Sequence, residues 1–264
     1  MAHRLEDRAI IALSGPDARP FLQGLITNDV DALAPDRPVY AALLTPQGKI
    51  LFDFIVSDDG TGTLLIDCWA PARDALAKRL SLYRLRAKVE ITPRDDLAAY
   101  ASWDGSALPG SPFVDPRLAA LGMRSVAPSG GSSGDYLAHR LSLGLPEGPD
   151  FGSDKTFALD AGLDELHGVA FDKGCYVGQE LTARMKHRGT ARKRILPIES
   201  ANNSALTAGA DIRAGGHGIG EIVSVYDNRG FALVRLDRLE DAGASPIDAA
   251  GVLMHIKKPG WLSA

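Results

Sequence analysis

The chain has 264 residues, of which 45% are hydrophobic and 23% charged, and its formal net charge is −4. This length predicts two or three compact units around a shared core, and the composition excludes a disordered chain, a coiled coil and a disulfide scaffold. No apolar run approaches the roughly 20 residues that span a bilayer, and the start of the chain has no signal-peptide core. We therefore expect a cytoplasmic protein with no membrane partner.

The N-terminal part alternates apolar runs with turns and helical patterns. The runs predict strands at Ala9–Leu13, Val39–Leu44, Ile50–Val56, Thr63–Trp69 and Lys88–Thr92. Helices are expected around Phe21–Leu25 and over Pro71–Leu85, where proline stands in the first turn. The turn Thr45–Gly48 joins two of the strands as a hairpin. Hairpins mixed with helices indicate an α+β fold, not a doubly wound parallel sheet.

The pattern changes after about residue 194. Short apolar runs such as Gly220–Tyr226 and Phe231–Leu236 are separated by turns rich in glycine and asparagine. The glycine-rich run Gly215–Gly220 lacks the spacing of a nucleotide-binding loop, so we interpret it as a turn between strands. The sequence predicts a small C-terminal β-barrel or sandwich.

The two cysteines, Cys68 and Cys175, lie far apart in the sequence. A reducing compartment keeps such residues as thiols, so no disulfide is expected. Two thiolates do not complete the four that usually hold an iron–sulfur cluster, and the six histidines show no close metal-binding spacing. We therefore predict no dedicated metal site, and any cluster would be shared or transient.

Cys175 stands in the run Phe171–Glu180, FDKGCYVGQE, which leads into the helix-forming residues Leu181–Lys186. A thiol just before a helix faces unpaired backbone N–H groups, and Lys173 adds a nearby positive charge. Both favour the thiolate, the form that attacks electrophiles and binds metals. Cys175 is the candidate catalytic residue, and the alternative is a small buried core residue.

The runs KGCYVGQE and TARMKHRG, in Lys173–Gly189, resemble the signature of the YgfZ-type folate-binding proteins. These are bacterial relatives of a mitochondrial iron–sulfur cluster assembly factor and of the T-protein, the aminomethyltransferase of the glycine cleavage system. The resemblance extends to Phe21–Val30, Gly48–Asp53 and Gly144–Leu163. It implies three subdomains in a ring with folate at the centre. Residues 1–194 would form two interleaved α+β subdomains that bind folate, and 195–264 the barrel.

The resemblance also implies site residues. The register from Gly48 places Asp53 where the T-protein has an aspartate near the reacting pterin nitrogen, and such a carboxylate can bond a reduced pterin. The alternative is an outward-facing side chain on a half-exposed strand. Ser142 stands where the T-protein has a glutamate, which argues against full aminomethyltransferase chemistry. The candidate folate-binding residues are Asp53, Lys173, Tyr176, Gln179, Glu180, Arg184 and Arg188.

A basic strip of six cations follows the motif: Arg184, Lys186, Arg188, Arg192, Lys193 and Arg194. Such a strip attracts the glutamate tail of a folate through charge and Arg–carboxylate hydrogen bonds. It also suits RNA phosphates, although no aromatic residues are interleaved for base stacking. A third interpretation is a solvated basic face that pairs with acidic neighbours.

Three functions follow. The first is an accessory protein that binds tetrahydrofolate or another reduced folate and supports the maturation of [4Fe–4S] enzymes together with iron–sulfur assembly proteins. The second is a tetrahydrofolate-dependent one-carbon transferase or demethylase related to the aminomethyltransferase. The third, motivated by the basic strip alone, is an RNA-associated protein. Whether the chain is an enzyme stays open.

Overall fold

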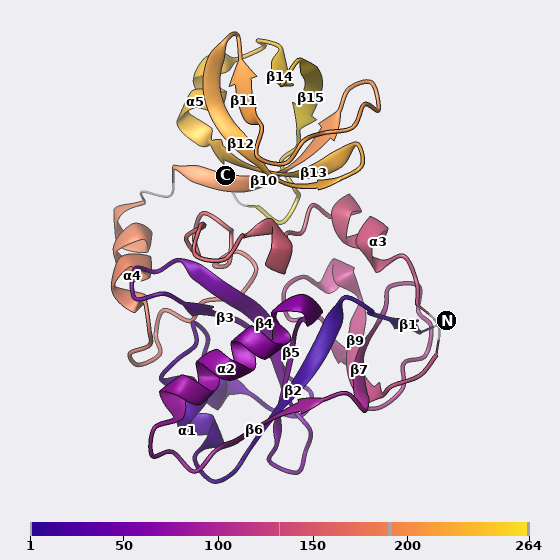
Figure 1. The fold of residues 1–264 in the computed structure, drawn as a ribbon, viewed down its shortest axis with the longest axis vertical. Helices are drawn as coiled ribbons and strands as arrows, with labels where there is room; N and C mark the ends of the chain where they lie inside the picture. Colours follow the sequence, from indigo (N-terminus) through magenta and orange to yellow (C-terminus); the bar gives the residue numbers. More distant parts are fainter. Residues whose placement is uncertain (1, 132, 190–191, 263–264) are drawn as a thin grey trace.

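The computed structural model describes residues 2–131, 133–189 and 192–262, and its strands form three sheets (Figure 1). The first sheet has five antiparallel strands in the order β3-β4-β5-β2-β6. Their bounds are β2 (Arg8–Ser14), β3 (Val39–Leu44), β4 (Ile50–Asp58), β5 (Leu64–Trp69) and β6 (Glu90–Arg94). All five predicted N-terminal strands are confirmed, with ends that differ by up to two residues.

Two helices pack on one face of this sheet. They are α1 (Ala18–Gln23) and α2 (Arg73–Arg84), and their buried residues Leu22, Leu76 and Leu80 join the apolar side chains of that face in one cluster. The predicted helices are therefore confirmed. Pro71 lies in the short 3-10 turn η2 (Ala70–Ala72) just before α2, because a proline fits a first turn, where no N–H donor is needed.

The second sheet has four strands in the order β1-β7-β9-β8. Their bounds are β1 (His3–Arg4), β7 (Leu97–Ser102), β8 (Phe113–Val114) and β9 (Met123–Pro128). Helix α3 (Tyr136–Ser142) follows this sheet in the chain. The 3-10 turns are η1 (Val30–Ala32), η3 (Ala119–Leu121) and η4 (Gly148–Asp150), and α4 (Gln179–Arg188) precedes the last unit.

The C-terminal unit is a closed barrel in the order β10-β13-β12-β11-β14-β15. Its elements are β10 (Lys193–Ser200), β11 (Asp211–Ala214), β12 (His217–Tyr226), β13 (Arg229–Arg235), α5 (Leu236–Ala242), β14 (Ile247–Ala249) and β15 (Val252–Ile256). Gly215 and Gly216 form the turn between β11 and β12 with positive φ angles. The structure confirms the predicted barrel, and the sandwich alternative is wrong. The predicted α+β fold class is also confirmed.

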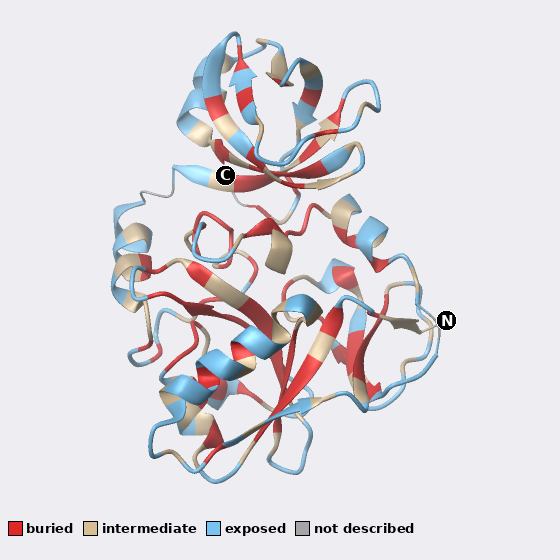
Figure 2. Cartoon of the chain, in the orientation of Figure 1, coloured by how far each residue is buried: buried red, intermediate tan, exposed pale blue. Residues whose placement is uncertain are grey.

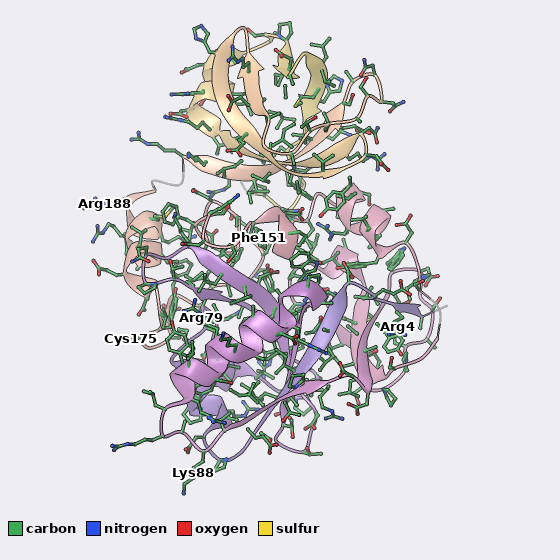
Figure 3. The ribbon with its side chains drawn as sticks, in the orientation of Figure 1. Arg4, Arg79, Lys88, Phe151, Cys175 and Arg188 are labelled. Atoms are coloured by element: carbon green, nitrogen blue, oxygen red, sulfur yellow. The ribbon has the colours of Figure 1, made fainter. Side chains whose placement is uncertain are left out.

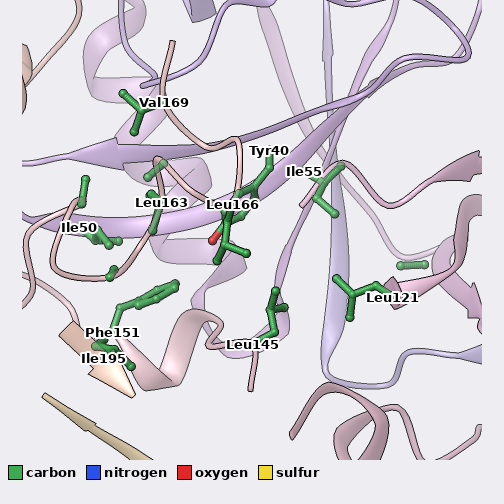
Figure 4. Close-up of a cluster of buried hydrophobic side chains, with 14 of the residues drawn as sticks. Tyr40, Ile50, Ile55, Leu121, Leu145, Phe151, Leu163, Leu166, Val169 and Ile195 are labelled. Atoms are coloured by element: carbon green, nitrogen blue, oxygen red, sulfur yellow. The ribbon is translucent and has the colours of Figure 1, made fainter. Parts of the chain in front are cut away.

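One core joins the three units. Buried side chains are most continuous where the sheets meet, and the exposed positions lie on the outer helix faces and turns (Figure 2). Phe151 lies at the junction below the barrel (Figure 3) and belongs to a cluster that also contains Tyr40 of β3, Leu121 near the second sheet and Ile195 of the barrel (Figure 4). Within the described residues, no helix is both long and apolar enough to cross a membrane.

Candidate functional site

Asp53 lies on β4, opposite Ala42 of β3, and its side chain is buried. Its Oδ2 accepts a hydrogen bond from the Tyr40 hydroxyl at 3.1 Å. The alternative of an outward-facing, half-exposed aspartate is therefore wrong. Asp53 lines a cavity of about 250 Å³. The other walls come from the ends of β4 and β5, the start of α2 and the turn at η4, with Phe52, Cys68, Trp69 and Gly148 among them.

An ionic network is buried close to Asp53. It contains four guanidinium groups, those of Arg8, Arg117, Arg124 and Arg140, and four carboxylates, those of Asp67, Asp115, Glu147 and Asp150. Each of these side chains is at most 4% exposed. Pairing of this kind is what allows charges to remain ionised away from water.

The network ties the three units together. Arg117 donates to Glu147 at 2.5 Å, and Arg124 donates to Asp67 of the first sheet at 2.7 Å. Asp150 accepts from Arg140 at 2.6 Å and from the Tyr226 hydroxyl of the barrel at 2.9 Å. Removing one partner would leave an uncompensated buried charge, so the network fixes how the units meet.

Burial and the charges of the network both act on the pKa of Asp53. Burial is the largest influence and raises the pKa of Asp53. The negative charge of Glu147 raises this pKa further, while the positive charges of Arg8 and Arg117 lower it. Burial also acts to raise the pKa of Glu147, but the charges of Arg117 and Arg8 outweigh it and hold that pKa well below its usual range. Because the four cations already face four carboxylates, their attraction does not offset the desolvation of Asp53, and its charged form is less favoured than that of an exposed aspartate.

The cavity walls combine apolar and polar groups. Trp69 supplies an aromatic side chain and Asp53 a carboxyl group, a combination typical of small-molecule sites. A Cβ atom on Gly148 would lie 3.1 Å from the Trp69 side chain and 3.5 Å from Asp53 Oδ1. A larger residue there would narrow the space above the carboxyl group, so glycine keeps the cavity open.

The motif around Cys175 lies elsewhere, in the loop before α4. Lys173 is buried, and its ammonium donates to the backbone oxygens of Gln23 at 2.8 Å, Ile26 at 2.8 Å and Asn28 at 2.7 Å. Burial lowers the pKa of Lys173 to about 8, while Asp29 and Asp31 act in the opposite direction. All three N–H donors of the ammonium are engaged, so Lys173 anchors the loop to the segment after α1.

Gly178 provides a second anchor. It is the residue before α4, with φ of +83°, and a Cβ atom there would lie 2.5 Å from the Thr45 oxygen and 2.9 Å from Leu44 Cβ. Only glycine fits both the left-handed backbone and this close approach to the β3–β4 hairpin. The predicted helix is confirmed, and it begins at Gln179, four residues after Cys175.

Cys175 itself is exposed, whereas Cys68 is buried. The alternative that Cys175 is a buried core residue is therefore wrong. The loop is held at Lys173 and Gly178, and the thiol between them faces solvent. The position suits reaction with a partner or a cluster precursor, because a metal-binding thiol has to be accessible.

The other candidate residues of the motif have different environments. Tyr176 is buried, and the Lys173 ammonium lies 5.3 Å from the centroid of its ring. Burial raises the pKa of Tyr176 to about 12. Gln179 is half-buried at the start of α4. Glu180 is exposed and accepts from Arg184 at 2.6 Å one helical turn later. Arg188 is exposed in the last turn (Figure 3).

Half of the basic strip pairs with acidic groups. Arg184 contacts Glu180, Lys186 contacts Asp164 at 2.9 Å and Arg194 contacts Glu165 at 3.3 Å. For Arg188, Arg192 and Lys193, no side-chain ion pair is found within the described part of the chain. Pairing with acidic neighbours thus accounts for part of the strip, and the binding of a folate tail or of RNA by the remainder stays a prediction.

The candidate residues thus occupy two places. Asp53 lines the cavity, and among the described residues its walls include none from Lys173 to Arg188. Sequence reasoning missed Trp69, Gly148 and the arginines of the network, which come from segments far apart in the chain. Gly148 lies within the resembling run Gly144–Leu163, and this is the signal that could have pointed to it. No described group of three or more His, Cys, Asp or Glu side chains is arranged to hold a metal ion.

Comparison with known proteins gives consistent matches. Residues 192–264 match the family model described as the C-terminal β-barrel domain of CAF17. The mitochondrial iron–sulfur cluster assembly factor IBA57 of Homo sapiens is 33% identical over 304 aligned residues, which cover 98% of this chain and 84% of the relative. For IBA57 of Mus musculus the identity is 32% over 284 residues, with 90% and 78% covered.

A solved structure matches over nearly the whole chain. It is the glycine cleavage system aminomethyltransferase T from Bartonella henselae, with a TM-score of 0.75 and 16% sequence identity, covering 99% of this chain and 86% of that one. At this identity the likeness concerns the fold alone. It confirms the expected T-protein-like arrangement of three subdomains with a C-terminal barrel.

Proposed function

Because the chain belongs to the family of IBA57 iron–sulfur cluster assembly factors, we propose that it is a folate-binding accessory protein that supports the maturation of [4Fe–4S] enzymes. This membership confirms the resemblance drawn from the Cys175 motif. We keep the predicted cytoplasmic location as part of the proposal, although the matched relatives are named mitochondrial. Its partners would be iron–sulfur assembly proteins and the client enzymes.

The single observation that carries the assembly role is the exposed Cys175 thiol on a loop anchored at both sides. As a thiolate, Cys175 can form a transient bond to iron or to a partner protein that carries the cluster. The cluster is the substrate in this role. Clusters are usually held by four thiolates, and this chain exposes one. Partner proteins would therefore supply the remaining ligands.

Deletion of the gene tests the assembly role. The activity of enzymes that carry [4Fe–4S] clusters should fall in the deletion strain, and the wild-type chain should restore it. Enzymes without a cluster serve as the control. Unchanged activity of the [4Fe–4S] enzymes would count against the proposal.

Folate binding is supported by the Asp53 cavity. The Asp53 carboxyl group would hydrogen-bond the polar edge of the pterin, and Trp69 would cover one of its faces. A bound folate would either carry one-carbon groups or stabilise the fold through its pterin ring. Titration with tetrahydrofolate, followed by tryptophan fluorescence, should show binding by the wild type and by Cys175→Ala, and weaker binding by Asp53→Ala. Equal binding by all three proteins would remove Asp53 from the site.

A second candidate function is a one-carbon transferase or demethylase that uses tetrahydrofolate as acceptor. Asp53, with its raised pKa inside a fold shared with an aminomethyltransferase, favours it. Ser142 weighs against the aminomethyl reaction itself, because it stands where the T-protein has a glutamate and offers no carboxylate. Its hydroxyl donates to the His139 oxygen at 2.7 Å at the end of α3. An aminomethyl donor carries its carbon at the oxidation level of formaldehyde, so its incubation with tetrahydrofolate should yield 5,10-methylenetetrahydrofolate and ammonia with no added oxidant. Failure with a broad donor panel, despite folate binding, would dismiss this candidate.

A further inference from the structure

The end of α2 carries a surface that none of the preceding roles uses. Between residues 78 and 88 the exposed cations are Lys78, Arg79, Arg84, Arg86 and Lys88. Two leucines are exposed among them, Leu82 at 65% and Leu85 at 89%. We call these seven residues the basic–leucine surface. The outer face of α2 is mostly exposed (Figure 2), and the Lys88 side chain extends away from the ribbon (Figure 3).

Packing of α2 does not account for the two leucines. The helix already buries Leu76 and Leu80 against the first sheet. Leu82 and Leu85 lie outside that contact, and Leu85 is the most exposed of the large hydrophobic residues that the structure describes. An isolated exposed leucine is common, but here two lie three residues apart in the sequence at the end of α2.

The backbone at Leu85 adds a second, independent observation. This residue ends α2 with φ of +44° and ψ of −105°. Glycine or asparagine is favoured at a helix end with positive φ, because a Cβ atom is strained there. The chain therefore holds a large apolar side chain in water at a position that disfavours it, which is typical of residues kept for binding and not for stability.

Cations outnumber carboxylates on this surface, where Asp17 accepts a hydrogen bond from the Lys88 backbone N–H at 2.7 Å. No aspartate or glutamate occurs between Asp74 and Glu90, although the whole chain has a formal net charge of −4. Within the described residues, none of the five cations forms an ion pair. The helix dipole favours Arg84 in the last turn, but it does not reach every cation of the set. A surface that exposes both cations and leucines is complementary to a negatively charged partner with aliphatic side chains.

We propose that the basic–leucine surface docks an acidic, leucine-bearing segment of a partner protein. An apolar centre with a charged rim is the usual anatomy of a protein–protein contact. Phosphates of a nucleic acid would engage the cations but leave the leucines in water. A membrane-surface helix would turn its broad apolar face to the lipid, and in α2 that face is buried against the sheet.

Binding of defined probes to the full chain tests the proposal. The probes are a synthetic helical peptide of glutamates and leucines, the same peptide with serine in place of leucine, anionic phosphatidylglycerol vesicles and a single-stranded RNA. The first peptide should bind most tightly, and both Leu82→Ser/Leu85→Ser and Arg79→Glu/Arg86→Glu should weaken it by about tenfold or more. Leu253→Ser and Arg213→Glu, at exposed barrel positions, are matched controls that should leave binding unchanged.

Each other result overturns the proposal. Failure of the glutamate–leucine peptide to bind, or binding that the four substitutions at the surface do not change, removes the surface as its docking site. Tighter binding of vesicles or of RNA assigns the surface to lipid or nucleic acid. Leu85→Gly provides a further readout, because it should raise the thermal unfolding midpoint and weaken the binding of the peptide. A lower midpoint would show that Leu85 serves stability instead.

Discussion

Lys173 and Cys175 are two residues apart and have opposite environments, since the ammonium of Lys173 is buried on three backbone oxygens and the thiol of Cys175 is exposed. The buried lysine fixes the loop, and the fixed loop presents the thiol. A lysine in this motif thus supports Cys175 by holding its backbone.

Replacement of Lys173 by methionine should destabilise the protein. Methionine has a similar shape but cannot donate to the oxygens of Gln23, Ile26 and Asn28. Buried acceptors left without partners predict a loss of about 2–4 kcal/mol in the free energy of unfolding, measured by urea denaturation. Lys78→Met, at an exposed position on α2, should change it by less than about 0.5 kcal/mol. Equal effects of the two substitutions would contradict the anchoring role of Lys173.

Gly178→Ala and Gly174→Ala form a second matched pair. At Gly178 a Cβ atom meets the Thr45 oxygen at 2.5 Å and the φ angle is positive, whereas at Gly174 nothing lies within 4 Å. Gly178→Ala should lower the free energy of unfolding by about 2–4 kcal/mol and displace the Cys175 loop. Gly174→Ala should be close to neutral. The prediction fails if both variants unfold at the wild-type urea midpoint.

The two thiols should differ in their reaction with iodoacetamide. Cys175 is exposed, while burial raises the pKa of Cys68 to about 12. In the native protein Cys175 should be alkylated first, and Cys68 should react at least about 100-fold more slowly until the chain unfolds. Mass spectrometry of a time course locates the label. Comparable labelling of both residues would show that Cys68 is not enclosed.

Asp53→Asn tests the protonation state in the cavity. A carboxyl group whose folded pKa is raised contributes stability below its unfolded pKa of 3.8, and this stability is lost as the pH rises through the folded pKa. Each unit by which folding raises the pKa of Asp53 lowers the free energy of unfolding of the wild type by about 1.4 kcal/mol at neutral pH. Asparagine does not ionise and avoids this loss. The stability of Asp53→Asn relative to wild type should therefore grow from pH 4 upward, as measured by urea unfolding. A difference independent of pH would mean an unshifted Asp53.

The sequence predicts the local parts of this molecule well, because they depend on patterns within a few residues. The hairpin turn Thr45–Gly48 and a small C-terminal barrel or sandwich follow from alternation and turn residues. The register from Gly48 reaches Asp53, and the family resemblance implies a role for it. The pattern alone favours an exposed Asp53, since an aspartate on a strand usually faces solvent.

The remainder of the site depends on contacts between distant segments. Arg8, Arg117 and Arg140 are common surface residue types, and no periodicity marks them as buried partners of carboxylates. Lys173 looked from the sequence like a neighbouring charge for the thiol, but its ammonium points to the segment after α1. Only the packed structure separates the Asp53 cavity from the Cys175 loop.

The central claim is that Cys175 is the working thiol of an iron–sulfur assembly factor. The most direct measurement is the activity of a [4Fe–4S] enzyme in a deletion strain that expresses Cys175→Ser or, as control on the same loop, Gly174→Ala at equal abundance. The expectation is that Gly174→Ala restores the activity and that Cys175→Ser does not. Restoration to the wild-type level by Cys175→Ser would contradict it.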